Sequence, residues 1–119
     1  MKLLVCGSRD YNDHLRLYQV LDAIHDQRGV TELIEGEAKG ADTLAREWAE
    51  SHNIPVRKFP ADWATYGRAA GPLRNTAMLV EGKPNLVVAF PKNGDLDATK
   101  GTRNMVRQAR TFNIEVMVI

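Results

Sequence analysis

The chain has 119 residues, of which 44% are hydrophobic and 26% are charged, so we expect one globular domain over residues 1–119. The formal net charge of +1 excludes a global electrostatic attraction to nucleic acid or to membranes. The single cysteine, Cys6, excludes an internal disulfide and favours a reducing, cytoplasmic location. The sequence shows no signal peptide and no apolar run of membrane-spanning length.

Five short apolar runs predict β-strands, and each gap between them is long enough for a helix. The first, fourth and fifth runs are almost continuously apolar, as in strands that are covered on both faces. The expected strands are residues 3–6, 31–34, 55–59, 85–90 and 114–119.

The gaps carry helical signals in turn. A helix is expected over residues 12–27, capped by Asp10 or Asn12 and stopped by Gly29. Apolar residues recur at helical spacing over residues 41–49. A third helix is expected to open at Pro72 and to close by Gly82, and a fourth to follow the loop 91–99 and end near residue 112.

Strands that alternate with helices imply a parallel sheet with right-handed crossovers. We therefore predict an α/β fold, a three-layer Rossmann-like sandwich with a five-stranded, mainly parallel sheet. Ligands of such folds bind beyond the carboxyl ends of the strands. Polar residues follow these ends at 7–9, 36–37, 60–62 and 91–93, so we expect them to line a crevice.

The stretch "EGEAKGADTLA" (residues 35–45) places Gly36 and Gly40 between a strand and a helix. Glycine lets the backbone approach a ligand closely, and the helix start offers free N–H groups to a phosphate or a ribose. The stretch matches neither G-x-G-x-x-G nor a P-loop. The alternative is that Gly40 and Asp42 merely begin a helix, since Asp is favoured in a first turn.

The stretch "NGDLDATKGTRNM" (residues 93–105) gathers Lys100, Gly101, Thr102 and Arg103 at a helix start. Cations at the positive end of the helix dipole cost about a few tenths of a kcal/mol each, and a bound anion would reverse that sign. This favours phosphate binding. The alternative is a solvated helix end at which nearby aspartates neutralise the cations.

The stretch "WATYGRAAGPLRN" (residues 63–75) carries Arg68 and Arg74, which suit bidentate contacts with oxyanions. Trp63 and Tyr66 either stack on a base, cover the site, or pack as core or interface. For Trp63 we expect packing in the core or at an interface, because large aromatic side chains usually bury.

A basic stripe, formed by Lys100, Arg103, Arg107 and Arg110, could follow a nucleic-acid backbone, but a solvated helix face is the favoured interpretation. The histidines show no metal-ligand spacing and are assigned to surface or helix-end positions. No metal site is predicted, although a phosphate could bring Mg²⁺ with it. Cys6 is expected to be buried and unreactive. The apolar spacing predicts core positions for Met78, Met105 and Met117.

The ordered set "GSRDY", "GEAKGADTLA", "GRAAGPLRN" and "KGTRNMV" resembles the small YspA-type, cpYpsA-related members of the SLOG superfamily. The resemblance implies a Rossmann-like fold that binds nucleotides or nucleotide-derived ligands. It also implies a bacterial or phage source and a homodimer or higher homo-oligomer. The relatives include the "Lonely Guy" phosphoribohydrolases and the DNA-processing protein that loads recombinase on single strands.

The resemblance implies roles for four groups of residues. In the first motif, Gly7, Ser8 and Arg9 would contact the ligand, and in the second, Gly36, Gly40 and Asp42 would frame its phosphate or sugar. Arg74 and Asn75 match the third motif of the family. In the fourth motif, Gly101 and Thr102 would bind the phosphate.

One departure is informative. The phosphoribohydrolases carry a catalytic glutamate three residues after the threonine, where this chain has Met105. Methionine cannot act as an acid or a base. The leading hypothesis is therefore a sensor or sequestering module for an ADP-ribose-like, NAD-like or mononucleotide ligand. The alternatives are a nucleotide hydrolase with Asp42 or Glu37 as base, and a single-stranded nucleic-acid binder.

Overall fold

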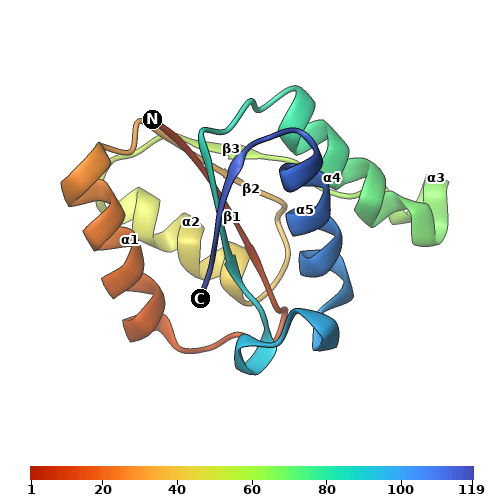
Figure 1. The fold of residues 1–119 in the computed structure, drawn as a ribbon, viewed down its shortest axis with the longest axis horizontal. Coiled ribbons are helices and arrows are strands. Elements are labelled where there is room, and N and C mark those ends of the chain that lie inside the picture. Colours follow the sequence, from red (N-terminus) through yellow and green to blue (C-terminus); the bar gives the residue numbers. More distant parts are fainter.

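All five strands join one parallel sheet in the order β3-β2-β1-β4-β5 (Figure 1). The computed structural model describes residues 1–119. The strands are β1 (Lys2–Gly7), β2 (Glu32–Glu35), β3 (Val56–Lys58), β4 (Leu86–Phe90) and β5 (Glu115–Val118). The helices are α1 (His14–Arg28), α2 (Ala41–Ser51), α3 (Trp63–Tyr66), α4 (Ala70–Val80) and α5 (Lys100–Thr111), with 3₁₀ turns at Gly67–Ala69, Lys92–Gly94 and Leu96–Ala98. The predicted element order and fold class are confirmed.

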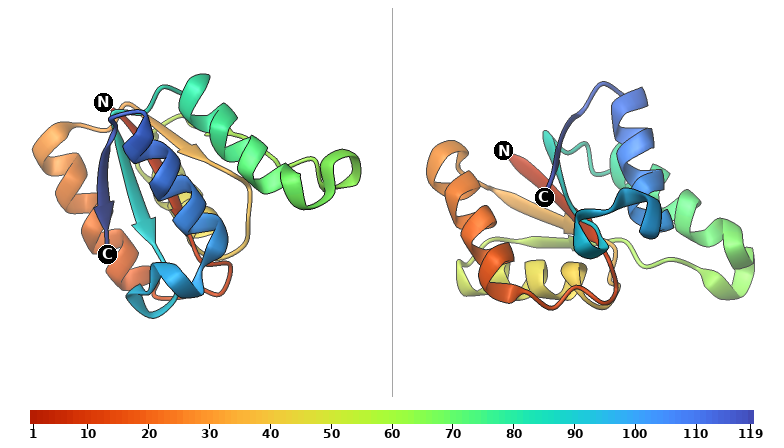
Figure 2. Two further views of the ribbon diagram at one scale, coloured as in Figure 1. Left: turned by 45° about the vertical axis from the view of Figure 1, so that its right-hand side comes forward. Right: turned by 60° about the horizontal axis from the view of Figure 1, so that its bottom comes forward.

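The sheet lies between two helical layers (Figure 2). Helices α1 and α2 pack with side chains such as Leu3 and Val5 of β1, whereas α4 and α5 pack with Leu4 and Cys6. Successive side chains of a strand point to opposite faces, so a central strand covered on both faces has to be apolar at every position. This is why β1 and β4 are continuous apolar runs in the sequence.

The last strand departs from the prediction. Residues 114–119 were expected to be covered on both faces and Met117 was expected in the core, yet Met117 is 38% and Val118 37% exposed. The reason is that β5 is an edge strand that pairs with β4 alone. The core positions predicted for Met78 and Met105 are confirmed.

Helix boundaries follow local hydrogen bonding. Helix α1 is capped by Asp13, whose Oδ1 accepts a hydrogen bond from the backbone N–H of Arg16 at 3.1 Å, so the caps predicted at Asp10 and Asn12 are wrong. Gly29 ends the helix with φ 68°, as expected. Helix α4 begins at Ala70 rather than at Pro72. Pro72 still lies in the first turn, where N–H groups have no partner within the helix.

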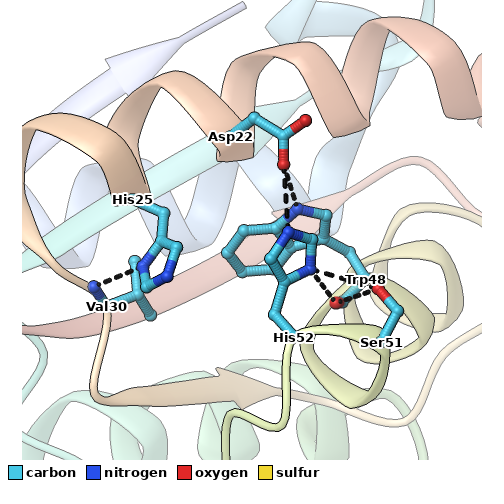
Figure 3. Close-up of polar contacts among 6 residues, drawn as sticks. All are labelled: Asp22, His25, Val30, Trp48, Ser51 and His52. Atoms are coloured by element: carbon cyan, nitrogen blue, oxygen red, sulfur yellow. Dashed lines mark hydrogen bonds and ion pairs between the residues drawn. The ribbon is translucent and has the colours of Figure 1, made fainter.

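A polar cluster joins α1 to the carboxyl end of α2 (Figure 3). The buried Trp48 donates from Nε1 to Oδ1 of Asp22 at 2.8 Å, and Nε2 of His52 lies 3.3 Å from the same oxygen. Nδ1 of His25 accepts a hydrogen bond from the N–H of Val30 at 2.9 Å. His25 and His52 therefore hold helix ends, as the sequence predicted.

Gly40, which precedes α2, is required by the backbone. Its φ is 73°, and a Cβ atom there would overlap the carbonyl oxygen of Ser8 and lie 2.6 Å from that of Arg9. A Cβ atom at Gly101 would meet no heavy atom within 4 Å. The two glycines therefore differ in what the fold demands of them.

Gly40→Ala should lower the free energy of unfolding by about 1–3 kcal/mol, because it combines left-handed strain with overlap. Gly101→Ala should raise it by about 0.5–1 kcal/mol, because alanine is the better helix former. Urea unfolding of both variants measures this difference. Equal effects would contradict it.

Candidate functional site

A pocket of about 490 Å³ lies beyond the carboxyl end of β1 and is also lined by residues of α4 and of the first turn of α5. It brings together residues that lie far apart in the sequence, from Cys6 to Asn104. Most of the residues predicted to bind a ligand line it: Gly7, Ser8, Arg9, Asp42, Arg68, Arg74, Asn75, Lys100, Gly101 and Thr102.

The remaining predicted residues lie elsewhere. Gly36 and Glu37 line an adjoining cavity of about 550 Å³. Gly40 lines neither cavity and packs against the loop after β1. Arg103 lines a separate groove with Arg107 and Arg110, so the basic stripe divides and only Lys100 of the four reaches the pocket.

The loop after β1 is fixed by the nearly buried Ser8. Its hydroxyl oxygen accepts from the N–H of Asp10 at 3.1 Å, and its carbonyl accepts from the N–H groups of Tyr11 and Ala41, both at 3.2 Å. Ser8 therefore shapes the turn that carries Arg9 to the pocket.

Asp42 anchors the turn after β2. Its Oδ2 accepts hydrogen bonds from the N–H groups of Gly36 at 3.1 Å and Ala38 at 3.2 Å. Burial raises the pKa of Asp42 to about 6, although these bonds and the nearby Arg74 favour the charged form. Asp42 thus has the structural role at the start of α2 that the sequence analysis gave as the alternative. It also lines the pocket.

Arg74 links this turn to the opposite layer. Its Nη1 donates to the carbonyl oxygen of Gly36 at 2.7 Å, and its Nε donates to Oδ1 of Asn75 at 3.1 Å. Nδ2 of Asn75 in turn donates to the carbonyl of Gly101 at 3.2 Å and to Oδ1 of Asn104 at 3.1 Å. Burial lowers the pKa of Arg74, and the Asp42 carboxylate opposes that shift. Asn104 also lines the pocket; it belongs to the motif "KGTRNMV" but was not among the residues predicted to bind a ligand.

The first turn of α5 offers backbone donors. No side chain caps it and it contains no acidic residue. Gly101 leaves open space above it, and Thr102 is 3% exposed on the pocket wall. Such a helix start carries a partial positive charge and N–H groups without partners, which suits an anion.

The pocket carries an excess of positive charge. Its cations are Arg9, Arg68, Arg74 and Lys100, and none forms an ion pair within 4.0 Å. Its carboxylates are those of Asp10 and Asp42, and Asp10 lies 3.7 Å from the ammonium of Lys92. A ligand with two or more negative charges would complement this arrangement.

Trp63 is not in the core, which corrects that part of the prediction. It is 49% exposed and lines the pocket. The guanidinium of Arg9 lies 5.4 Å from its ring centroid, a cation–π contact. The reason is its place on α3, which extends beyond the sheet (Figure 1). Tyr66 is 55% exposed and does not line the pocket.

Three further buried side chains lie in or behind the pocket wall, and Cys6 is the one that lines the pocket. Glu35 is fully buried, with Oε2 accepting from the N–H of Glu37 at 2.7 Å and Oε1 without a partner. Burial raises the pKa of Glu35 to about 7. Cys6 is buried as expected, and burial raises the pKa of its thiol. Met105 is fully buried in the core.

No group of His, Cys, Asp and Glu side chains is arranged to hold a metal ion. None of the helices has the length and apolar character needed to cross a membrane.

The protein has a Rossmann-like α/β fold, and the pocket at the carboxyl edge of its sheet carries an excess of positive charge. The family model of the YspA, cpYpsA-related SLOG family matches residues 1–66, and the chain belongs to that family. The chain is also 33% identical over 122 residues to the "Gene 61 protein" of Mycobacterium phage D29. That alignment covers 98% of this chain and 94% of the phage protein, which fits the expected bacterial or phage source.

The pH dependence of stability should reveal the two buried carboxylates. Their pKa values in the folded protein, about 7 for Glu35 and about 6 for Asp42, lie above the ordinary values of 4.5 and 3.8. The folded state therefore binds these protons more tightly than the unfolded state does. As a result, the free energy of unfolding falls as the pH rises from about 4.5 to about 7.

Glu35→Gln removes one of these groups and keeps an acceptor for the N–H of Glu37. When the pH is raised from 5 to 8, the free energy of unfolding should fall in both proteins. The fall should be smaller in the variant than in the wild type, by roughly 2–3 kcal/mol. Urea unfolding at both pH values measures this, with Glu81→Gln, at an exposed position, as the control. Parallel profiles for wild type and Glu35→Gln would contradict the assignment.

Proposed function

We propose that the protein binds a nucleotide or nucleotide-derived ligand at the carboxyl edge of its sheet and acts as a sensor or sequestering module. The observation that carries this proposal is the convergence of four unpaired cations and the uncapped start of α5 on one pocket. Membership of a SLOG family supports a nucleotide-related ligand.

The phosphate of the ligand would sit in front of α5. The N–H groups of the first turn and the ammonium of Lys100 would donate to its oxygens, and Thr102 would add a hydroxyl. Charge-assisted hydrogen bonds of this kind contribute roughly 1.5–3 kcal/mol each. Gly101 supports the placement, because no neighbouring atom in the protein requires a glycine there, whereas a close phosphate does.

The base of the ligand would stack on Trp63. An indole that is half exposed beside a guanidinium is a ready surface for a planar group. Arg9, whose guanidinium lies against Trp63, would contact the ligand next to the base. The oligomer in this proposal is a homodimer or higher homo-oligomer that covers the exposed edge strand β5, and its location is the cytoplasm.

A binding function needs charge complementarity, whereas hydrolysis also needs an acid or base in reach of the ligand. Met105 occupies the position of the glutamate of the phosphoribohydrolases and is buried in the core.

Asp42 is the one carboxylate that lines the pocket with a raised pKa, near 6, and this favours a second candidate function, a nucleotide hydrolase. Both of its backbone bonds go to Oδ2, so Oδ1 would be the atom that activates a water.

Lys100→Ala should weaken the binding of nucleoside diphosphates by roughly 10-fold, because it removes a charged donor at the helix start. Lys83→Ala, a matched change at an exposed lysine outside the pocket, should leave binding unchanged. Isothermal titration with ADP, GDP, CDP and UDP measures both. Mass spectrometry of small molecules released from the heat-denatured protein would identify a ligand that copurifies. If no nucleotide binds and none copurifies, the proposal is wrong.

Asp42→Asn separates the two candidate functions. Asparagine can still accept from Gly36 and Ala38 through its carbonyl oxygen, so the turn is retained, but it cannot act as a base. If the protein hydrolyses nucleotides through Asp42, product formation followed by chromatography should fall at least about 100-fold. Glu37→Gln is the parallel test for the other carboxylate considered. Turnover that survives both changes would exclude these residues, and its absence in the wild type would favour pure binding.

A further inference from the structure

A second cavity opens beside the pocket. It measures about 550 Å³ and is lined by the turn after β2, by Pro60 and Ala61, and by Trp63. Arg9 and Arg74 line both cavities, so the two are compartments of one cleft that meet at these cations. Each compartment also has charged residues of its own. The first contains Lys100 at the start of α5, and the second is lined by Glu37 and Lys39.

Glu37 is held in place by the buried Glu35. The N–H of Glu37 donates to Oε2 of Glu35 at 2.7 Å, and this bond accompanies a left-handed backbone with φ 57°. The side chain of Glu37 is 35% exposed, and its ion pair with Lys58 is long, at 3.9 Å. The carboxylate therefore keeps acceptor capacity, and Glu37 is one of the residues that line the second cavity.

We propose that the second cavity binds the ribose of the ligand and that Glu37 accepts hydrogen bonds from its two vicinal hydroxyls. This inference rests on the proposed function and names the class of ligand, a ribonucleotide rather than a deoxyribonucleotide. The phosphates cross the junction at Arg9 and Arg74 and reach the start of α5. The base lies against Pro60, Ala61 and Trp63.

The chemistry of Glu37 selects this occupant. An ionised carboxylate is an acceptor only, so it needs donors and repels an anion. A vicinal diol supplies two O–H donors without charge. The position also fits the topology, since Glu37 follows the carboxyl end of β2, beside β1, in a sheet of order β3-β2-β1-β4-β5. In dinucleotide-binding sheets of this order an acidic residue binds the ribose hydroxyls.

The test compares sugars at a constant base. Titration calorimetry with ADP, GDP, CDP and UDP, each beside its 2′-deoxy counterpart, should show roughly 10-fold or tighter binding of the ribonucleotide. Glu37→Gln should reduce this ratio to near one, mainly by weakening the ribonucleotide. Glu81→Gln, at an exposed position that lines neither cavity, should retain the wild-type ratio. Circular dichroism and the midpoint of thermal unfolding confirm that both variants are folded.

The outcomes separate this inference from the function on which it rests. Equal binding of ribo- and deoxyribonucleotides by the wild type would overturn the ribose assignment and leave nucleotide binding intact. A sugar preference that persists in Glu37→Gln would also overturn the role of Glu37. Failure of every nucleotide to bind would overturn the proposed function and this inference together.

Discussion

The hydrogen bond from Nη1 of Arg74 to the carbonyl oxygen of Gly36, at 2.7 Å, joins α4 to the turn after β2 at the carboxyl edge of the sheet. It forms because residue 36 has no side chain, since a Cβ atom there would overlap the guanidinium of Arg74. Asp42 holds the same turn from α2, and Asn75 carries the connection to Gly101 in α5. One continuous set of contacts thus fixes both walls of the pocket. The cationic side chain that would bind a ligand is also the one that shapes the site.

The fold was predictable where burial is uniform along an element. In β1 and β4 every residue between the helical layers must be apolar, and the sequence records this directly. The environment of β5 was not predictable, because its apolar residues are the same whether the strand is central or at an edge. That difference depends on the strand order, which hydrophobic periodicity does not encode. Trp63 was missed for a related reason, since nothing local indicates that α3 extends beyond the layers.

The general place of the site was also predictable, because parallel strands bring their carboxyl ends to one edge. The role of each residue was not. Gly40 and Gly101 both lie at the start of a helix next to polar residues. The sequence therefore predicts the same role for both, a close approach of the backbone to a ligand. Only the surrounding atoms distinguish them: Gly40 faces two carbonyl oxygens, and Gly101 faces open space. Arg103 illustrates the same limit. It follows Lys100 by three residues in α5, yet its guanidinium lies 3.5 Å from Asp97 and lines another groove than Lys100.

The buried carboxylates of Glu35 and Asp42 have different structural roles. This difference bears on whether the pocket only binds a ligand or also catalyses a reaction. Burial is the largest cause of the raised pKa of both groups. Glu35 lies behind the pocket wall, and its hydrogen bond from the N–H of Glu37 shapes the turn after β2. Its raised pKa is therefore a consequence of burial in a structural position and does not indicate a catalytic role. Asp42 lines the pocket but is bound at Oδ2 by two backbone groups, as a structural cap would be. A raised pKa at the edge of a Rossmann-like sheet is therefore insufficient evidence for catalysis. The four cations of the pocket, none of which forms an ion pair with a carboxylate of the protein, are the stronger indication of a ligand.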